Sequence, residues 1–306
     1  MIEIKHLSKA FDTHLVLKDM NITFEKGMIF GLIGINGAGK STFLRLISGI
    51  LQPDQGEIWI EGKKISEHGY LRKDIFYLSD QPPYSYQMTI LDLAKLYATF
   101  YTFHWDIYRS VLSRFHLTDE QPLSRISKGM RRQGYIAIAF ASGASYLLLD
   151  EVFDGLDPVA RLTFKKLMIE YQSEGKIFII TSHSLRELED ICDTFGMIDQ
   201  GIFKRFGNVD FELHLFKKYQ VILKNTVPVI LKENHPKIFY HAQEGRILTL
   251  VIDANQPIDL WIDPTHYHVA DELELSFEEY FMINKGGVES WRNTSAIWLK
   301  QNGYRP

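Results

Sequence analysis

The stretch Gly34-Ile-Asn-Gly-Ala-Gly-Lys-Ser41 matches the phosphate-loop pattern G-x4-G-K-S. A short apolar run at 28–33 precedes it, and apolar residues at helical spacing follow it from 42 to 50. Glycine permits tight backbone turns with positive φ, so successive N–H groups can point at phosphate oxygens. The stretch therefore predicts a strand, a phosphate-binding loop and a helix, in that order.

Lys40 and Ser41 supply the chemistry of this loop. A lysine at this position reaches the β- and γ-phosphates of a nucleotide, and the hydroxyl after it ligates Mg²⁺. The helix that follows aims its positive end at the same anion. A chance match arises in roughly 1 in 100 chains of this length, given that glycine makes up about 7% of residues. The strand and helix around the loop therefore favour nucleotide binding over chance.

A second candidate group is the pair Asp150 and Glu151, which follows the apolar run 146–149. Acidic residues after a buried strand usually lie at a solvated strand end. Downstream of a phosphate loop, one carboxylate can join the Mg²⁺ shell and the other can activate water. The pair therefore predicts hydrolysis as well as binding.

Alternating strand and helix patterns place this chemistry in a layered α/β fold. The apolar runs 146–149 and 176–180 are typical of buried parallel strands, and a helical pattern at 158–171 separates them. From 89 to 117, apolar residues recur at intervals of three and four, with an interruption near Trp105. We expect the stretch 89–145 to be a helical insertion. This alternation around a glycine-rich turn predicts an α/β core of stacked layers.

The pattern changes after about residue 210, where strand-like pieces joined by Asn, Pro and Gly turns begin. These pieces are 219–223, 229–231, 247–252 and 258–262, followed by a helix-like segment at 276–281 and a tail with Trp291 and Trp298. We predict two domains, 1–210 and a small α+β domain at 211–306. An apolar docking face of the second domain is expected from Leu273, Leu275, Phe277, Tyr280 and Phe281.

Composition excludes several classes of protein. With 45% hydrophobic and 24% charged residues among 306, the chain is neither disordered nor supercharged. A net charge of −4 provides no broad basic field, so no nucleic-acid partner is expected. The one cysteine, Cys192, cannot form an internal disulfide, which is typical of a reducing compartment.

No membrane span or leader is expected either. The longest apolar stretch, 135–149, contains Ser142, Gly143 and Ser145, whereas a span takes about 20 continuous apolar residues. The stretch is better explained as a buried helix followed by a buried strand. The first residues lack the basic-then-apolar layout of a signal peptide. Any membrane role would therefore come through a partner.

Further motifs accompany the loop and the acidic pair in a fixed order. They are Phe11, Ile126-Ser127-Lys128-Gly129-Met130-Arg131, Phe153-Asp154-Gly155-Leu156-Asp157-Pro158 and Thr181-Ser182-His183. Together they resemble the ATP-binding-cassette (ABC) family, with its adenine-stacking aromatic, its signature, its D-loop and its switch histidine. The resemblance covers about 1–205 and implies a P-loop NTPase ABC cassette. Such a cassette has a RecA-like core, an antiparallel β subdomain and a helical subdomain.

The resemblance implies an ATPase in which two cassettes enclose two ATP molecules head to tail. Ser127 and Gly129 of one chain close on the γ-phosphate bound by the other. Glu151 polarises the attacking water, His183 contacts the γ-phosphate, and Lys40 completes the catalytic set. The implied metal ligands for Mg²⁺ are Ser41, Asp80 and Asp150. The implied nucleotide contacts are Phe11, Asn36, Gly37, Ala38, Gly39, Lys40, Ser41, Thr42, Asp80, Ser127, Gly129 and Asp157, the last also linking the two sites.

Departures from the family pattern lie around the signature and the Q-loop. Lys128 stands where the family most often has a second glycine, and either nucleotide anchoring or a solvent-facing role is open to it. With Arg131 and Arg132 it forms a basic cluster, which we expect to position the helix rather than contact nucleic acid. The Q-loop glutamine of the family falls on Asp80, with Gln81 one residue later. Either of these two residues could sense Mg²⁺ and the attacking water.

The sequence therefore predicts the ATP-hydrolysing subunit of a bacterial-type ABC exporter that powers a separate transmembrane permease. Ser-Lys-Gly-Met at 127–130 resembles the signature variant of ABC-2-type drug and antibiotic-peptide exporters. We expect a cytoplasmic protein, peripheral on the inner face of the cell membrane, paired with an identical or a sister cassette. The alternatives are a soluble ABC ATPase acting on ribosomes or nucleic acid, and a regulatory cassette that scarcely hydrolyses ATP. The cargo would be determined by the permease.

Overall fold

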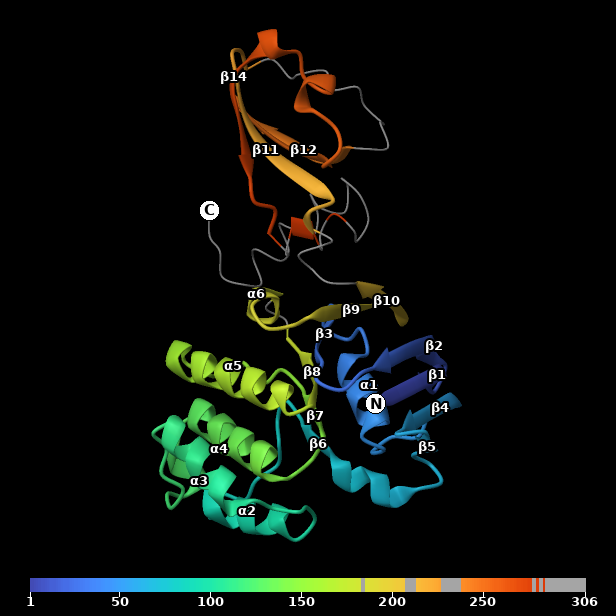
Figure 1. Ribbon diagram of the computed structural model, residues 1–306, viewed down its shortest axis with the longest axis vertical. Helices are drawn as coiled ribbons and strands as arrows, with labels where there is room; N and C mark the ends of the chain where they lie inside the picture. Colours follow the sequence, from blue (N-terminus) through green and yellow to red (C-terminus); the bar gives the residue numbers. More distant parts are fainter. Residues whose placement is uncertain (183–184, 207–212, 227–237, 277–278, 281–282, 284–306) are drawn as a thin grey trace. The chain divides into compact units, whose positions relative to one another are not determined.

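The computed structural model of the chain describes residues 1–182, 185–206, 213–226, 238–276, 279–280 and 283 (Figure 1). Contacts between Cα atoms divide the chain into two units, Met1–Gly207 and Asn208–Pro306. Each unit has its own sheet and its own apolar core, so each is described by itself.

The first unit is built on a ten-stranded sheet with the order β5-β4-β1-β2-β10-β9-β3-β8-β7-β6. Its strands are β1 (Ile2–Phe11), β2 (His14–Phe24), β3 (Ile29–Ile33), β4 (Gln55–Ile60), β5 (Lys63–Lys64), β6 (Ile75–Leu78), β7 (Tyr146–Leu149), β8 (Ile177–Thr181), β9 (Thr194–Asp199) and β10 (Ile202–Phe206). Strands β9, β3, β8, β7 and β6 pair in parallel. Strand β3 is buried along its whole length, as expected for a strand covered on both faces. The predicted parallel core is therefore confirmed.

The other end of the sheet is antiparallel, with β1 between β2 and β4. It meets the parallel part through one register pair, Lys18 with Ile202. Helix α1 (Lys40–Ile47) packs its apolar face into a core shared by both parts. The fully buried side chains of that face are Phe43, Leu44, Leu46 and Ile47. Each contributes roughly 1.5–3 kcal/mol by burial, so the helix after the phosphate loop is held firmly.

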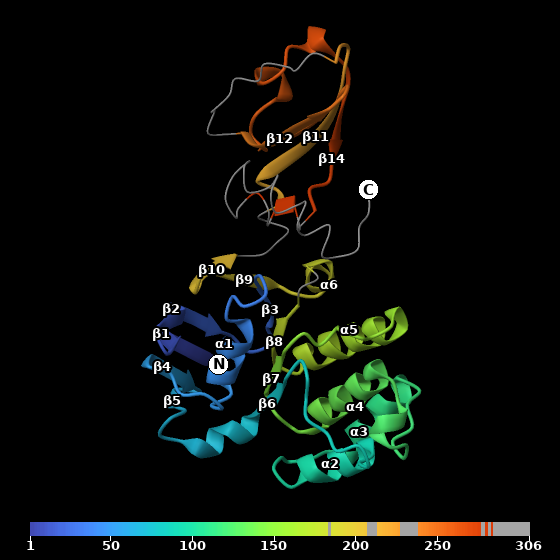
Figure 2. The same ribbon diagram turned by 180° about the vertical axis from the view of Figure 1, so that it is seen from behind.

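The remaining α-helices of the first unit lie on the opposite side of the parallel strands (Figures 1 and 2). They are α2 (Ile90–Ala98), α3 (Trp105–Arg114), α4 (Lys128–Ala141), α5 (Pro158–Ser173) and α6 (Leu185–Glu189). In Figure 1, and from behind in Figure 2, strands β6 to β8 separate α1 from α2–α5. Most of α4 is buried. The apolar stretch 135–149 is therefore a buried helix followed by a buried strand, as predicted.

The second unit contains a four-stranded antiparallel sheet with the order β12-β13-β11-β14. Its strands are β11 (Phe216–Leu223), β12 (Ile238–Glu244), β13 (Ile247–Asp253) and β14 (Tyr267–Leu273). Alternate residues of β11 and β13 face a core that Trp261 and Ile262 complete. Two short 3₁₀ helices, η3 (Ile258–Leu260) and η4 (Pro264–His266), lead into β14.

One predicted strand of the second unit is wrong. Residues 258–262 form η3 and a turn, because the Trp261 N–H bonds back to the Ile258 carbonyl at 2.8 Å. Pro257 comes just before η3 and cannot donate a hydrogen bond to a sheet. The turn directs Trp261 into the core. Residues 229–231 and the tail tryptophans Trp291 and Trp298 lie outside the described residues.

The expected docking face of the second unit is also only partly available. Leu275 and Tyr280 are buried, and the Tyr280 ring contacts Phe216 of β11 at 5.6 Å between centroids. Leu273 is 39% exposed, and Phe277 and Phe281 lie outside the described residues. Tyr280 therefore packs within its own unit rather than forming a free face.

Across the described ranges, no helix combines the length and the apolar character that a membrane crossing needs. The longest of them, α5, has 16 residues and alternates buried and exposed positions.

A capping box at the start of α2 provides a test of the helical region. The Thr89 hydroxyl accepts the Asp92 N–H at 3.1 Å, and the Asp92 carboxylate accepts the Thr89 N–H at 3.0 Å. We predict that Thr89→Ala destabilises α2 by about 1 kcal/mol, because an orphan N–H loses its acceptor. Native-state hydrogen exchange of the α2 amides measures this. Thr99→Ala at the other end of α2 is the matched control, and an equal effect there would contradict the prediction.

Candidate functional site

The phosphate loop connects β3 to α1, with its backbone in the conformation that glycine permits. Gly37 and Gly39 have φ of 82° and 107°, in the region that side chains disfavour. A Cβ on Gly39 would lie 2.9 Å from Leu17 Cδ2, so space also requires glycine there. Ala38 is buried, whereas Asn36 is exposed at the tip. The loop is therefore built to present backbone N–H groups at the start of α1.

Lys40, the first residue of α1, connects this loop with the acidic pair. Its ammonium donates to the carbonyls of Gly34 at 2.8 Å and Ile35 at 3.4 Å, and its Nζ lies 3.7 Å from Glu151 Oε1. The side chain is 7% exposed. Burial lowers the pKa of Lys40, and the charges of Glu151 and Asp150 oppose that shift. The fold thus brings together two groups that are more than a hundred positions apart in the chain.

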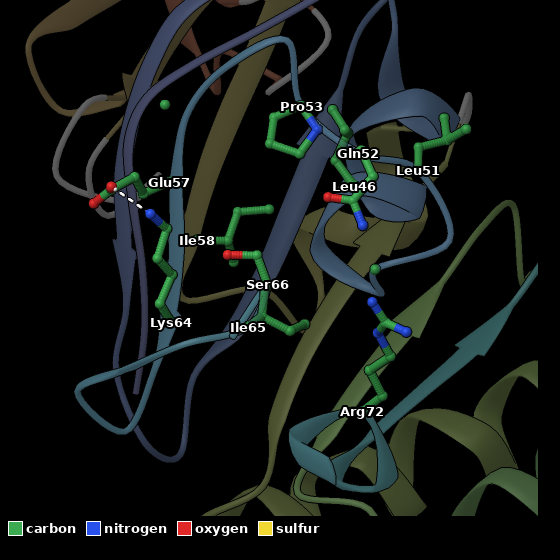
Figure 3. A pocket seen from close by; sticks show the side chains of 12 residues that line it. Leu46, Leu51, Gln52, Pro53, Glu57, Ile58, Lys64, Ile65, Ser66 and Arg72 are labelled. Carbon is green, nitrogen blue, oxygen red and sulfur yellow. Dashed lines mark hydrogen bonds and ion pairs between the residues drawn. The ribbon is translucent and has the colours of Figure 1, made fainter. Parts of the chain in front are cut away.

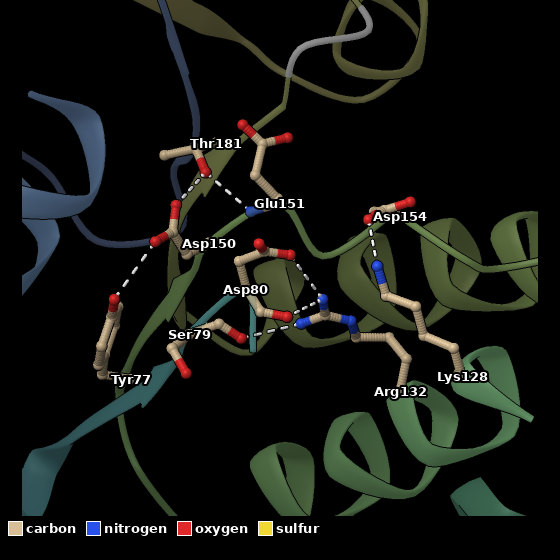
Figure 4. Close-up of polar contacts among 9 residues, drawn as sticks. All are labelled: Tyr77, Ser79, Asp80, Lys128, Arg132, Asp150, Glu151, Asp154 and Thr181. Atoms are coloured by element: carbon tan, nitrogen blue, oxygen red, sulfur yellow. Dashed lines mark hydrogen bonds and ion pairs between the residues drawn. The ribbon is translucent and has the colours of Figure 1, made fainter. Parts of the chain in front are cut away.

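Asp150 is held by hydroxyls from the strands on either side (Figure 4). It lies 2% exposed at the end of β7. Its Oδ1 accepts the Thr181 hydroxyl of β8 at 2.7 Å, and its Oδ2 accepts the Tyr77 hydroxyl of β6 at 3.3 Å. Burial raises the pKa of Tyr77 to about 12, so this phenol keeps the proton that it donates. The carboxyl ends of three parallel strands therefore position the candidate metal ligand.

Glu151 follows with strained backbone geometry. Its φ is 47°, a conformation that costs a non-glycine residue roughly 1–3 kcal/mol and concentrates at functional sites. Its N–H donates to Thr181 Oγ1 at 2.8 Å (Figure 4), and its carbonyl accepts the Asp154 N–H at 3.1 Å. These bonds keep the sharp turn in place, so that Glu151 approaches Lys40.

The signature lies at the start of α4. Ser127 is exposed and caps this helix, because its hydroxyl accepts the Met130 N–H at 3.1 Å. Gly129 packs against the D-loop so closely that a Cβ would lie 2.3 Å from the Gly155 carbonyl oxygen. Asp157 caps α5 by accepting the N–H groups of the next turn. The signature and the D-loop of one chain are therefore in direct contact.

The Lys128 side chain contacts the D-loop. Its ammonium forms an ion pair with Asp154 of the D-loop at 2.5 Å, while half of the side chain remains exposed (Figure 4).

Arg132, on the same helix, binds the Q-loop. It donates to the carbonyls of Ser79 at 2.9 Å and Asp80 at 2.5 Å, and to Asp80 Oδ1 at 3.2 Å (Figure 4). The arginine is 3% exposed. Burial lowers the pKa of Arg132, and Asp80 is the first of the charges that oppose the shift. One carboxylate oxygen of Asp80 therefore accepts a hydrogen bond from the Arg132 guanidinium, whereas Gln81 is exposed.

The other predicted site residues have fewer contacts with the groups described above, or lie outside the described residues. Phe11 ends β1 with 44% of its surface exposed, and the Lys9 ammonium lies 5.6 Å from its ring centroid. Ser41 and Thr42 are half-buried in α1. His183 lies outside the described residues. The sequence reasoning missed Tyr77 and Asp154 as partners. The position of Tyr77 on a strand beside the one that ends in Asp150 is the signal that could have found it.

A small cavity lies elsewhere in the first unit (Figure 3). It has a volume of about 30 Å³ and is lined from the end of α1, from β4 and from residues near Arg72. Glu57 and Lys64 form an ion pair of 2.7 Å at its edge. A water molecule needs roughly 10–15 Å³ of such volume, so the cavity is far too small for a nucleotide.

Comparison with known proteins identifies the family. The chain is 31% identical over 297 residues to the ABC transporter ATP-binding protein YtrB of Bacillus subtilis, covering 95% of this chain and all of that one. The chain belongs to the ABC transporter ATP-binding family. The family model described as "ABC transporter" matches residues 17–154 of this cassette.

Further comparisons agree. The cassette is 32% identical over 203 residues to the lantibiotic transport ATP-binding protein SrtF of Streptococcus pyogenes, covering 66% of this chain and 88% of that one. A solved ATP-binding subunit of an ABC transporter superposes with a TM-score of 0.65 and 29% identity, over 69% of this chain and 91% of that one. The predicted fold class and family are therefore confirmed, and members of this family hydrolyse ATP. The match to YtrB extends into the second unit of the chain.

The hydroxyl of Tyr77 gives a test of how Asp150 is positioned. We predict that Tyr77→Phe weakens Mg²⁺-dependent ATP binding about 2- to 10-fold, since one hydrogen bond to the carboxylate, worth about 0.5–1.5 kcal/mol, is lost. Titration of Mg²⁺ at fixed ATP measures the change. Tyr70→Phe is the control, because that exposed phenol accepts a hydrogen bond from an exposed lysine, Lys63, at 3.1 Å. Superimposable titrations of Tyr77→Phe and wild type would refute the role.

Proposed function

We propose that this cassette binds ATP with Mg²⁺ and hydrolyses it to power a transmembrane permease on a separate chain. The observation that carries the proposal is the approach of Lys40 to Glu151, with 3.7 Å between ammonium and carboxylate. One group suits the γ-phosphate and the other suits the attacking water. Their proximity is what hydrolysis of a phosphate bound in this loop requires.

Phosphate binding falls to the loop and to Lys40. The glycine backbone of the loop and the N-terminus of α1 offer N–H donors to the phosphate oxygens. In the described conformation Lys40 donates to two loop carbonyls, and a phosphate would compete for the same ammonium. Because the side chain is buried, its attraction for phosphate is screened little by water.

The two residues of the acidic pair have different roles, one in activating water and one in binding the metal. Glu151 takes a proton from the attacking water, and its strained turn holds it at the site. The hydroxyl of Ser41 and the carboxylate of Asp150 are hard oxygen donors, which Mg²⁺ prefers. When bound, Mg²⁺ neutralises charge on the phosphates. Tyr77 and Thr181 keep Asp150 in place for that role. Gln81 would complete the metal site from the Q-loop, because Arg132 already bonds the Asp80 carboxylate.

A second cassette, identical or a sister chain, completes each site. Ser127 is exposed, and it lies at the N-terminus of the 14-residue helix α4. We expect the hydrogen-bond donors there to bind the nucleotide of the second cassette, and not the nucleotide in the phosphate loop of their own chain. Together with Gly129 they would close on the γ-phosphate of the partner chain. His183 would contact that phosphate from its own chain, and Asp157 would lie at the shared interface.

The export direction is part of the proposal. Two features support it: the Ser-Lys-Gly-Met form of the signature, and the similarity to a lantibiotic transport protein. We place the cassette, about residues 1–210, in the cytoplasm against the inner face of the membrane. The domain at 211–306 would stabilise or regulate the dimer.

A capture experiment tests the coupling to a permease. Glu151→Gln should retain ATP and the closed dimer, because it removes the water-activating carboxylate and keeps the side-chain size. We expect tagged Glu151→Gln, purified from detergent-solubilised native membranes with ATP, to retain a polytopic membrane protein. The control is Lys40→Ala on the same background, which should lose both ATP and the partner. Recovery of ribosomes or only soluble partners, by a protein that binds ATP, would contradict the transporter proposal.

The second domain is tested by truncation after Gly207. We predict that the truncated chain binds ATP with unchanged affinity but dimerises about 5-fold or more weakly in ATP, as for a coupling energy of about 1–3 kcal/mol. Sedimentation of the Glu151→Gln form with and without ATP measures the dimer. An unchanged dimerisation constant would remove the proposed role of the second domain.

A further inference from the structure

The first turns of α4 carry an arrangement of charge that local helix energetics do not favour. Lys128, Arg131 and Arg132 lie there, and the first turn holds no acidic residue. A helix N-terminus has a partial positive charge, so cations at this end are disfavoured. Cations at an unfavourable helix end indicate that their side chains form compensating contacts with other parts of the structure.

Each outer cation of this cluster binds a different loop of the nucleotide site. Lys128 pairs with Asp154 of the D-loop at 2.5 Å, and its stem lies 3.3 Å from the position that a Cβ on Gly155 would take. Arg132 binds two carbonyls and the carboxylate at the start of the Q-loop. Figure 4 shows the Lys128 side chain extending from α4 to Asp154, and the Arg132 side chain extending from α4 to Ser79 and Asp80.

Both loops lead directly to the reacting groups. The Asp154 N–H bonds the carbonyl of Glu151 at 3.1 Å. The Q-loop follows β6, whose Tyr77 bonds Asp150. Ser127, meanwhile, precedes Lys128 in the chain and caps the same helix. A short path of contacts therefore connects the acids of one chain with its own signature serine.

We propose that Lys128 and Arg132 are positioning residues that fix the signature of a cassette to the D-loop and the Q-loop of the same cassette. We call these two ion-paired contacts the α4 junction. The proposal rests on the proposed function, since Ser127 is expected to act on the nucleotide of the second cassette. A movement of either loop at one nucleotide site would then shift the serine at the other site.

The burial of the two contacts separates their roles. The Lys128–Asp154 pair is about half exposed, and exposed pairs add little to folding stability. Its effect is therefore on the position of the signature. Arg132 is buried, and its removal would leave the two carbonyls and the Asp80 carboxylate without their donor. Arg132 therefore also holds the Q-loop against the helix.

A charge swap tests the exposed half of the junction. We expect Lys128→Asp and Asp154→Lys each to lower kcat for ATP hydrolysis about 10-fold, because small displacements of catalytic groups are costly. The KM for ATP should stay within about twofold, because the phosphate loop is untouched. The double variant should recover kcat to within about threefold of wild type.

Thermal stability distinguishes positioning from folding. Lys128→Asp places an acid at the first position of α4, which the helix dipole favours, so the Tm should hold or rise while kcat falls. The matched control is Glu170→Gln, which breaks an equally exposed pair with Arg114, 2.6 Å long, between α3 and α5. That variant should keep wild-type kcat.

The buried half is tested at the Q-loop, because Arg132 variants can fail to fold. Asp80→Asn should lower kcat at saturating Mg²⁺ and leave the Mg²⁺ concentration for half-maximal activity unchanged. A several-fold rise in that concentration would mean that Asp80 ligates the metal, and would overturn its assignment to the junction.

The outcomes for the junction and for the proposed function are distinguishable. Recovery of kcat in the double charge swap, with a Tm in Lys128→Asp that holds or rises, supports the junction. A wild type that hydrolyses ATP, combined with a double variant no better than the single ones, overturns the junction alone. A Tm of Lys128→Asp that falls in parallel with its kcat also overturns the junction alone, because the variant would then act through folding. A folded wild type without ATP hydrolysis would overturn the proposed function and the junction with it.

Discussion

The buried ammonium of Lys40 is the group around which the site is organised. It has little water, so the carbonyls of the phosphate loop and the carboxylate of Glu151 must stabilise its charge. This requirement brings the start of α1 and the end of β7 together. The parallel strands satisfy it because their carboxyl ends meet at one edge of the sheet, where Asp150 also receives two hydroxyl bonds.

A second constraint comes from the close contact of Gly129 with Gly155. No side chain fits at Gly129 against the Gly155 carbonyl, so α4 and the D-loop touch through their backbones at this point. The cations of α4 then fill the surrounding space and bind the loops on both sides. The start of α4 thus binds the loops next to β6 and β7 through polar contacts, in addition to the apolar packing of the rest of the helix.

Local patterns of the chain predicted the elements well where one interaction dominates. The apolar runs at β3, β7 and β8 are buried on both faces, and such runs have few other uses. The prediction was wrong at 258–262, where the same apolar character serves a 3₁₀ turn that inserts Trp261 into a core. Apolar character over five residues cannot distinguish these cases, because a short apolar run suits a buried strand and a turn that inserts Trp261 and Ile262 into a core alike.

The sequence by itself determined the phosphate loop, the acidic pair, the family resemblance and the α/β class, because each depends on short local runs of residues and on their order along the chain. Tertiary structure alone decided that Lys128 pairs with Asp154, that Arg132 binds the Q-loop and that Tyr77 supports Asp150. These partners are 26, 52 and 73 positions apart. Their pairing depends on strand order and on the placement of α4, and no local pattern of residue types carries that information.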